Sequence, residues 1–285
     1  MTTSEGESQE LAHPGPLPSF REPPVVEVVL AVSFETIPGL DNLQILRFWE
    51  GQLQAYFPKV EQQAPYSPPV ERFGQRASMP QVKLELVGAP PTPRYWFINE
   101  ADTEVIQLQS DWFARNWRKR EHNPQYHRYE SIREPFAQDF RRLTRFVEEH
   151  GLGSIKPIQC EVTYINQITL DEGWRDHSDL SKIVTVWQDT DSFLPKPEQV
   201  QFLSSYVIPG EERPLGRLHV SMQPAFTVAE QQPIYVLNVT ARGYPLGDNL
   251  QGVLRFFDIG HEWVVRGFTS ITSDVMHRVW GRDDI

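Results

Sequence analysis

The sequence contains a single cysteine, Cys160, among its 285 residues. One cysteine excludes a disulfide within the chain, and it excludes a structural zinc site built from several thiolates. The absence of a disulfide framework is typical of proteins in a reducing compartment, so we expect a cytoplasmic protein. Cys160 alternates with Val162 on the apolar side of a predicted strand, and we interpret it as a small core residue.

Long apolar runs are also missing. No stretch approaches the roughly twenty consecutive apolar residues that a membrane-spanning helix needs. Residues 1–24 are polar, acidic and rich in proline, without the basic start and apolar run of a signal peptide. We therefore expect no association with a membrane, and we interpret residues 1–24 as a disordered tail.

The common catalytic signatures are absent as well. The sequence has no phosphate-binding loop, no Gly-x-Gly-x-x-Gly motif after a strand and no Gly-x-Ser-x-Gly motif. The pair His261-Glu262 lacks the second histidine of a zinc helix, because position 265 is Val265. We expect no metal and no cofactor, and we interpret His261 as a hydrogen-bonded histidine on the apolar stripe of its helix. Whether the protein is an enzyme stays open, with a non-enzyme favoured.

The net charge of −11 at pH 7 argues against one class of partner. Proteins that bind duplex nucleic acid present a basic surface, so we do not expect an extended duplex as a partner. One segment departs from this balance, because residues 115–145 contain nine Lys/Arg and four Asp/Glu.

Hydrophobic periodicity predicts alternating groups of strands and helices. Val28, Leu30 and Val32 alternate with other residues in the first strand, whereas Phe136, Phe140 and Leu143 recur at helical spacing. The predicted strands are 25–35, 81–88, 94–99, 103–109, 158–170, 200–208, 216–223 and 234–242, and the predicted helices are 41–57, 131–150, 180–187, 248–271 and 273–280.

Both halves of the chain therefore have the order strand, helix, three strands, helix. We predict an α+β fold in which residues 25–153 and 154–285 are duplicated units that share one curved antiparallel sheet, with helices on one face. This order is similar to that of the TATA-binding-protein-like and gyrase-inhibitor-like folds, in which the two leading strands are neighbours at a pseudo-twofold axis. The alternative is a single α+β sheet whose two halves share an element order by accident.

Five segments carry a resemblance to a known family. They are residues 23–30 (PPVVEVVL), 107–117, 164–168 (YINQI), 260–262 (GHE) and 268–272 (FTSIT). In these the chain resembles a sporadically distributed bacterial protein family that has no assigned activity. The resemblance implies bacterial origin and one shared architecture, and it implies no mechanism.

The first candidate site follows from the predicted duplication. Glu27 and Glu161 point away from the apolar side of the two leading strands, because successive side chains of a strand alternate. If these strands are neighbours, the two carboxylates approach each other on the open face, together with Thr163 and Gln167. They then attract a cationic ligand, or share a proton when desolvated. The alternative is two solvated glutamates on a wet sheet face.

The second candidate site is the aromatic and basic segment 112–133. Trp112 and Trp117 can stack on bases, and Arg118 and Arg120 can bind phosphates. The alternative is that the tryptophans pack a loop onto the sheet while the arginines lie in solvent or pair with carboxylates of the chain.

We therefore predict a non-enzymatic protein that binds a ligand or partner through the open sheet face or the groove at its pseudo-twofold axis. The partner is an unidentified small molecule or protein. The alternatives are a protein that binds a nucleotide or a short single-stranded nucleic acid through residues 112–133, and an enzyme whose site lacks a recognisable motif.

Overall fold

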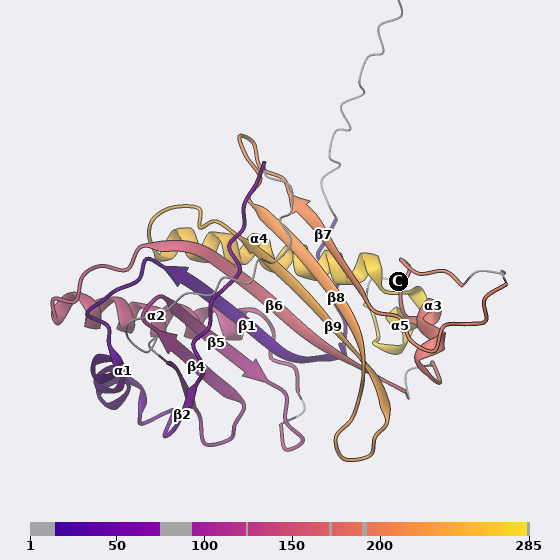
Figure 1. Ribbon diagram of the computed structural model, residues 1–285, viewed down its shortest axis with the longest axis horizontal. Coiled ribbons are helices and arrows are strands. Elements are labelled where there is room, and N and C mark those ends of the chain that lie inside the picture. Colours follow the sequence, from indigo (N-terminus) through magenta and orange to yellow (C-terminus); the bar gives the residue numbers. More distant parts are fainter. Residues whose placement is uncertain (1–14, 75–92, 124, 171–172, 190–192, 284–285) are drawn as a thin grey trace, which may run out of the picture.

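The computed structural model describes residues 15–74, 93–123, 125–170, 173–189 and 193–283. Within these residues nine strands form one antiparallel sheet, and the long helices lie against one of its faces (Figure 1). This confirms the predicted α+β class. In the same described residues, no helix is long and apolar enough to cross a membrane.

The strands and helices have the following bounds. The strands are β1 (Val25–Phe34), β2 (Lys59–Gln63), β3 (Arg94–Ile98), β4 (Glu104–Gln109), β5 (Trp112–Arg118), β6 (Pro157–Thr169), β7 (Phe202–Ile208), β8 (Gly216–Phe226) and β9 (Pro233–Gly243). The helices are α1 (Asn42–Phe48), α2 (Glu130–Glu149), α3 (Leu180–Ile183), α4 (Leu250–Ile271) and α5 (Asp274–Val279), with a π-helical turn η1 (Trp49–Leu53) and a 3-10 turn η3 (His177–Asp179).

The two strands that open the halves of the chain lie side by side in the centre of the sheet. The strand order is β2-β3-β4-β5-β1-β6-β9-β8-β7, and β1 pairs with β6 in the antiparallel sense. Each central strand is flanked on its other side by the last strand of its own half, β5 for β1 and β9 for β6. The groove predicted between the leading strands is therefore the centre of one continuous sheet.

The main hydrophobic core lies between the sheet and the two long helices. Helix α2 packs on β5, and α4 packs on β6 and β9. Alternation within β1 buries Val28, Leu30 and Val32 completely on this side. Helix α4 approaches β6 closely at Gly260, where an added Cβ would lie 2.9 Å from a methyl carbon of Val162. We call this side the helix face and the opposite side the open face.

Some predicted element boundaries were wrong. The helix expected over 41–57 is interrupted, since α1 ends at Phe48 and the chain continues in η1. The long last helix is capped by Asn249, whose side chain accepts from the Gly252 amide at 3.1 Å, and Asp248 precedes this cap. The strand predicted at 81–88 lies outside the described residues.

Two strands escaped prediction altogether. Strand β2 is an exposed edge strand of sequence KVEQQ and has no apolar alternation. Strand β5 is buried on both faces, and it includes Arg115 and Asn116, which satisfy their polar groups by pairing with other side chains. Buried polar residues break the hydrophobic pattern from which strands are predicted.

The interpretation of residues 1–24 as a disordered tail was wrong for its last part. Phe20 is only 5% exposed, and its ring packs against Phe268 and Trp280. The amides of Arg21 and Glu22 donate to main-chain carbonyls at Gly281 and Trp280, each at 3.1 Å. The chain is thus attached to the second half of the fold before β1 begins.

Candidate functional site

A segment of the chain lies across the open face of the sheet. After β2, residues 66–73 run in front of the sheet from its first edge toward β8, opposite to α2 and α4 (Figure 1). We call residues 66–73 the strap. Its sequence, YSPPVERF, contains two prolines, which favour an extended backbone without internal hydrogen bonds.

Two glutamines of the sheet hold the strap backbone. Gln109 of β4 accepts from the Tyr66 amide at 2.9 Å and donates to the Tyr66 carbonyl at 3.1 Å. Gln159 of β6 accepts from the Glu71 amide at 2.8 Å and donates to the Pro69 carbonyl at 2.7 Å. A carboxamide offers one donor and one acceptor, so each glutamine satisfies the peptide groups much as a neighbouring strand would.

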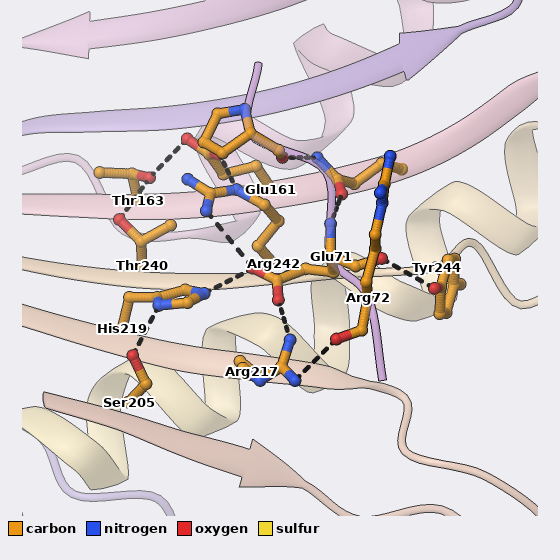
Figure 2. A network of polar contacts seen from close by, with 12 residues as sticks. Glu71, Arg72, Glu161, Thr163, Ser205, Arg217, His219, Thr240, Arg242 and Tyr244 are labelled. Atoms are coloured by element: carbon orange, nitrogen blue, oxygen red, sulfur yellow. Dashed lines mark hydrogen bonds and ion pairs between the residues drawn. The ribbon is translucent and has the colours of Figure 1, made fainter. Parts of the chain in front are cut away.

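The strap places a carboxylate, that of Glu71, among three basic side chains. Glu71 is 5% exposed, and its carboxylate accepts hydrogen bonds from Arg217 and His219 of β8 and from Arg242 of β9 (Figure 2). The His219 Nε2 atom is 2.5 Å from the carboxylate, and Arg242 lies at 3.4 Å. We call Arg217, His219 and Arg242 the basic cluster.

The pKa of Glu71 reflects this environment. Burial by itself raises the pKa of a carboxyl group, but the hydrogen bonds from His219 and Arg217 outweigh burial and lower the pKa of Glu71 to about 2. The Glu71 main chain is fixed as well, because the Tyr244 hydroxyl donates to its carbonyl at 2.9 Å. At neutral pH Glu71 is therefore an ionised, firmly held group.

The basic cluster has one further carboxylate within the sheet. The Nε atom of Arg242 donates to Glu161 at 2.7 Å, and Thr163 donates to the same carboxylate at 3.0 Å. Thr163 also bonds Thr240 on the neighbouring strand at 2.9 Å. Glu161 and Thr163, both predicted from sequence, are thus part of this polar network (Figure 2).

The first half of the chain has a related pair on the same face. Glu27 accepts from Asn116 at 2.5 Å and from Arg118 at 3.3 Å. The guanidinium of Arg118 also lies over the Trp96 ring, 4.8 Å from its centroid, and 3.7 Å from Asp102. The charge of Arg118 is therefore balanced by residues of the first half of the chain.

The expected approach of Glu27 to Glu161 was wrong. In the register of β1 and β6, Glu27 lies opposite Ile165 and Glu161 lies opposite Ala31. Four residue steps separate the two positions, which is about 13 Å along a strand at about 3.3 Å per residue. Each carboxylate instead pairs with an arginine of its own half. Gln167 lies farther along β6, in a groove shared with Lys119.

The aromatic and basic segment does not form one surface. Trp112 and Trp117 project from opposite faces of β5: Trp112 lies under Tyr66 of the strap at 4.8 Å, and Trp117 is in the main core beside Tyr126. Arg118 pairs with Glu27, and Arg120 pairs with Asp102 at 2.8 Å. These four predicted residues are therefore divided between two faces. The tryptophans pack against other side chains, and the arginines form ion pairs with carboxylates of the chain.

Sequence reasoning missed Glu71 and the basic cluster. Arg217 and His219 alternate with Leu218 and Val220 in a predicted strand, which places two basic side chains on its polar face. That pattern was a usable signal. Nothing in the sequence indicated that Glu71, 146 residues from Arg217, would meet it.

On the helix face, His261 is hydrogen-bonded as expected. Its Nδ1 atom lies 3.0 Å from the Tyr164 hydroxyl, and its ring stacks on Tyr129 with centroids 4.1 Å apart. Burial lowers the pKa of His261 to about 4 and raises the pKa of the Tyr164 phenol, so both groups are neutral at pH 7.

Comparisons with known proteins give no family or function for this site. Neither the models of protein families, nor the curated proteins, nor the solved structures yielded a match. Among the described residues, no group of three or more His, Cys, Asp or Glu side chains is placed to hold a metal ion.

Proposed function

We propose that this is a binding protein whose open sheet face holds an extended, acidic peptide segment of a partner protein. The observation that carries the proposal is the strap: the face already binds such a segment, taken from the chain itself. The glutamines bind its backbone, and the basic cluster binds its carboxylate.

The charges of the open face support an anionic ligand. With the strap in place, Arg217, His219 and Arg242 face two carboxylates, Glu71 and Glu161. Without Glu71, Arg242 would keep Glu161, whereas Arg217 and His219 would lose the carboxylate that they bind. A partly buried cluster with two arginines favours a carboxylate from another molecule, because charge-assisted hydrogen bonds are strong where water is scarce.

The backbone contacts support an extended peptide rather than a small anion. Gln109 and Gln159 recognise peptide groups that are three to five residues apart, and these hydrogen bonds go to the main chain of the strap. Tyr66 supplies an aromatic anchor, because its ring packs on Trp112. A ligand with an aromatic residue, a proline-rich spacer and a carboxylate would match all three features.

The internal duplication that we infer gives this site an origin. The order β5-β1-β6-β9 is symmetrical about the contact between β1 and β6, and each flanking strand carries an arginine that binds a glutamate of its leading strand. Under this proposal the two halves began as equivalent units. Only the second acquired the additional basic residues Arg217 and His219.

A synthetic peptide of residues 65–73 tests the function directly. In the wild-type protein the strap competes at high effective concentration, so we expect no measurable binding. In Glu71→Lys the strap side chain repels the basic cluster, and we expect the peptide to bind in calorimetry. A peptide with Gln at the position of Glu71 is the matched control, and we expect it to bind at least about tenfold more weakly, as loss of a charged hydrogen bond implies.

Two further variants keep this test decisive. Glu71→Gln replaces Glu71→Lys if the lysine variant does not fold, and Arg217→Met combined with either variant should abolish binding. Equal affinity for the two peptides would overturn the proposal. Binding of a short single-stranded oligonucleotide that is lost in Arg118→Glu would favour the nucleic-acid alternative instead.

A further inference from the structure

A cavity lies on the helix face, on the other side of the sheet from the strap. Its volume is about 200 Å³, and it is bounded by residues 17–23, the start of α2, β6 and α4. Its walls are mostly apolar, with Val25 on one side and Val264, Val265 and Phe268 on another. A cavity of about 150 Å³ accommodates benzene, so this one has room for a substituted six-membered ring.

One side of the cavity carries a chain of uncharged polar groups. The Tyr126 hydroxyl donates to the Tyr164 hydroxyl at 3.2 Å, and the Tyr164 hydroxyl lies 3.0 Å from Nδ1 of His261. With Tyr164 donating to Nδ1, the ring proton of the neutral imidazole is on Nε2. All three residues line the cavity.

Asn166 adds a buried acceptor without a partner. Its side chain is 1% exposed, and its amide nitrogen donates to the Leu237 carbonyl at 3.0 Å. That contact fixes which end of the amide is nitrogen, because two acceptors would repel each other. The other end, Oδ1, has no hydrogen-bond partner among the described residues, and Asn166 lines the cavity. A buried carbonyl oxygen left unpaired is unfavourable, and a ligand with a donor would relieve this.

Charged ligands do not match this cavity. Arg128, which lies at its rim, already donates to the Phe20 carbonyl at 3.2 Å and to the Ser19 hydroxyl at 3.4 Å. Glu130 also lines the cavity and would repel an anion, whereas a cation would have to be desolvated against apolar walls.

We propose that this cavity is a binding site for a small uncharged ring compound that carries a hydrogen-bond donor, such as a primary amide. The ring occupies the apolar part between residues 17–23 and α4. The donor binds Oδ1 of Asn166. This site is independent of the peptide function proposed for the open face, and either can fail without the other.

Three probes of nearly equal size test the site: benzamide, toluene and benzoate. Binding is followed by chemical-shift titration of the full chain. We expect benzamide to bind most tightly, toluene about five- to tenfold more weakly for lack of the donor, and benzoate not at all. The shifted resonances should belong to residues around Val265 and Tyr164.

Two variants and a control complete the experiment. Val265→Trp fills the cavity from a half-buried helix position, and benzamide affinity should fall at least tenfold. Asn166→Leu should remove the preference for benzamide while toluene still binds. Val279→Trp makes the same change at an exposed position of α5 outside the cavity lining, and it should bind benzamide as the wild type does.

Each failure has a defined meaning. Absence of binding by all three probes, or unchanged benzamide affinity in a folded Val265→Trp, would overturn the site. Equal affinity of the wild type for benzamide and toluene would overturn the role of Asn166. If Val265→Trp does not fold, Asn166→Leu with the toluene comparison decides the matter.

Discussion

Two arginines in equivalent places of the sheet have different surroundings. Arg118 ends β5 and pairs with Glu27 of β1, whereas Arg242 lies near the end of β9 and pairs with Glu161 of β6. Both side chains are 13% exposed. Their carboxylate partners differ: the side chain of Glu27 is 22% exposed, whereas the side chains of Glu161 and Glu71 are 12% and 6% exposed.

The comparison shows that the balance of charges in one half of the sheet can depend on a segment that is remote in the sequence. Around Arg118, the sheet and its hairpin supply Glu27, Asp102 and the Trp96 ring. Around Arg242, the sheet adds two more basic groups, Arg217 and His219, and only one carboxylate. The balance is restored by the strap, which comes from the other half of the chain. Charge balance at this site is therefore conditional on strap position.

The largest expected difference is between Arg242→Met and Arg118→Met. Arg242→Met leaves Glu161 and Glu71 with one fewer buried partner, and we expect a loss of about 3 kcal/mol in the free energy of unfolding. Arg118→Met leaves a carboxylate that water reaches more easily, and we expect a loss of about 1 kcal/mol. Urea unfolding of both variants measures this difference. Equal losses would show that the strap contributes nothing to the charge balance.

A second comparison is between Glu71→Gln and Glu27→Gln. Both variants keep an acceptor and lose the charge. We expect a loss of about 2 kcal/mol for Glu71→Gln and less than about 1 kcal/mol for Glu27→Gln, because only Glu71 accepts charged hydrogen bonds from two arginines. Urea unfolding at pH 7 compares the two variants.

The pH dependence of the Glu71 effect has a definite sign. A carboxyl group whose pKa is lower in the folded state stabilises the fold above its unfolded pKa, and this stabilisation is lost as pH falls toward the folded pKa. The pKa of Glu71 is about 2 in the folded protein, against 4.5 for an ordinary glutamate side chain. The stability difference between wild type and Glu71→Gln should therefore shrink as the pH falls from about 5 to 2. A difference that persists unchanged at pH 3 would contradict this.

Much of the sheet could be predicted from sequence because its helix face is regular. Val28, Leu30 and Val32 alternate without exception, and the stripe of α2 recurs at helical spacing. The adjacency of β1 and β6 was expected from the similarity of the predicted element order to two duplicated folds, although that order lacked β2 and β5. Strand register did not, because register depends on which residues meet across the sheet, and the error of about 13 Å between Glu27 and Glu161 came from there.

Only part of the candidate site could be predicted from the sequence. Strand parity correctly placed Glu161 and Thr163 on the polar face, as a local rule should. Glu71 was beyond such rules, because no periodicity connects a proline-rich segment to strands that begin only at Gly216 and Pro233. The prediction of disorder at Phe20 was wrong for a similar reason. One aromatic ring in a polar segment is a weak signal, and its partners Phe268 and Trp280 lie at the far end of the chain.

The smallest expected difference in stability is between variants of the two glutamines that hold the strap. Gln159→Leu leaves the Glu71 amide and the Pro69 carbonyl without these partners, and Gln109→Leu does the same to both main-chain groups of Tyr66. Each variant should lose about 1 kcal/mol in the free energy of unfolding, since a net hydrogen bond contributes about that much and part of the strap can be hydrated.

Hydrogen exchange at the Glu71 and Tyr66 amides gives more information than the free energy of unfolding. If the strap opens from the Glu71 end, Gln159→Leu should accelerate exchange at Glu71 about tenfold and leave Tyr66 unchanged, while Gln109→Leu accelerates Tyr66 alone. If both amides accelerate together in either variant, the strap lifts as a single unit. A partner peptide could then displace it only by binding along its full length, whereas independent ends would let a partner carboxylate occupy the basic cluster first.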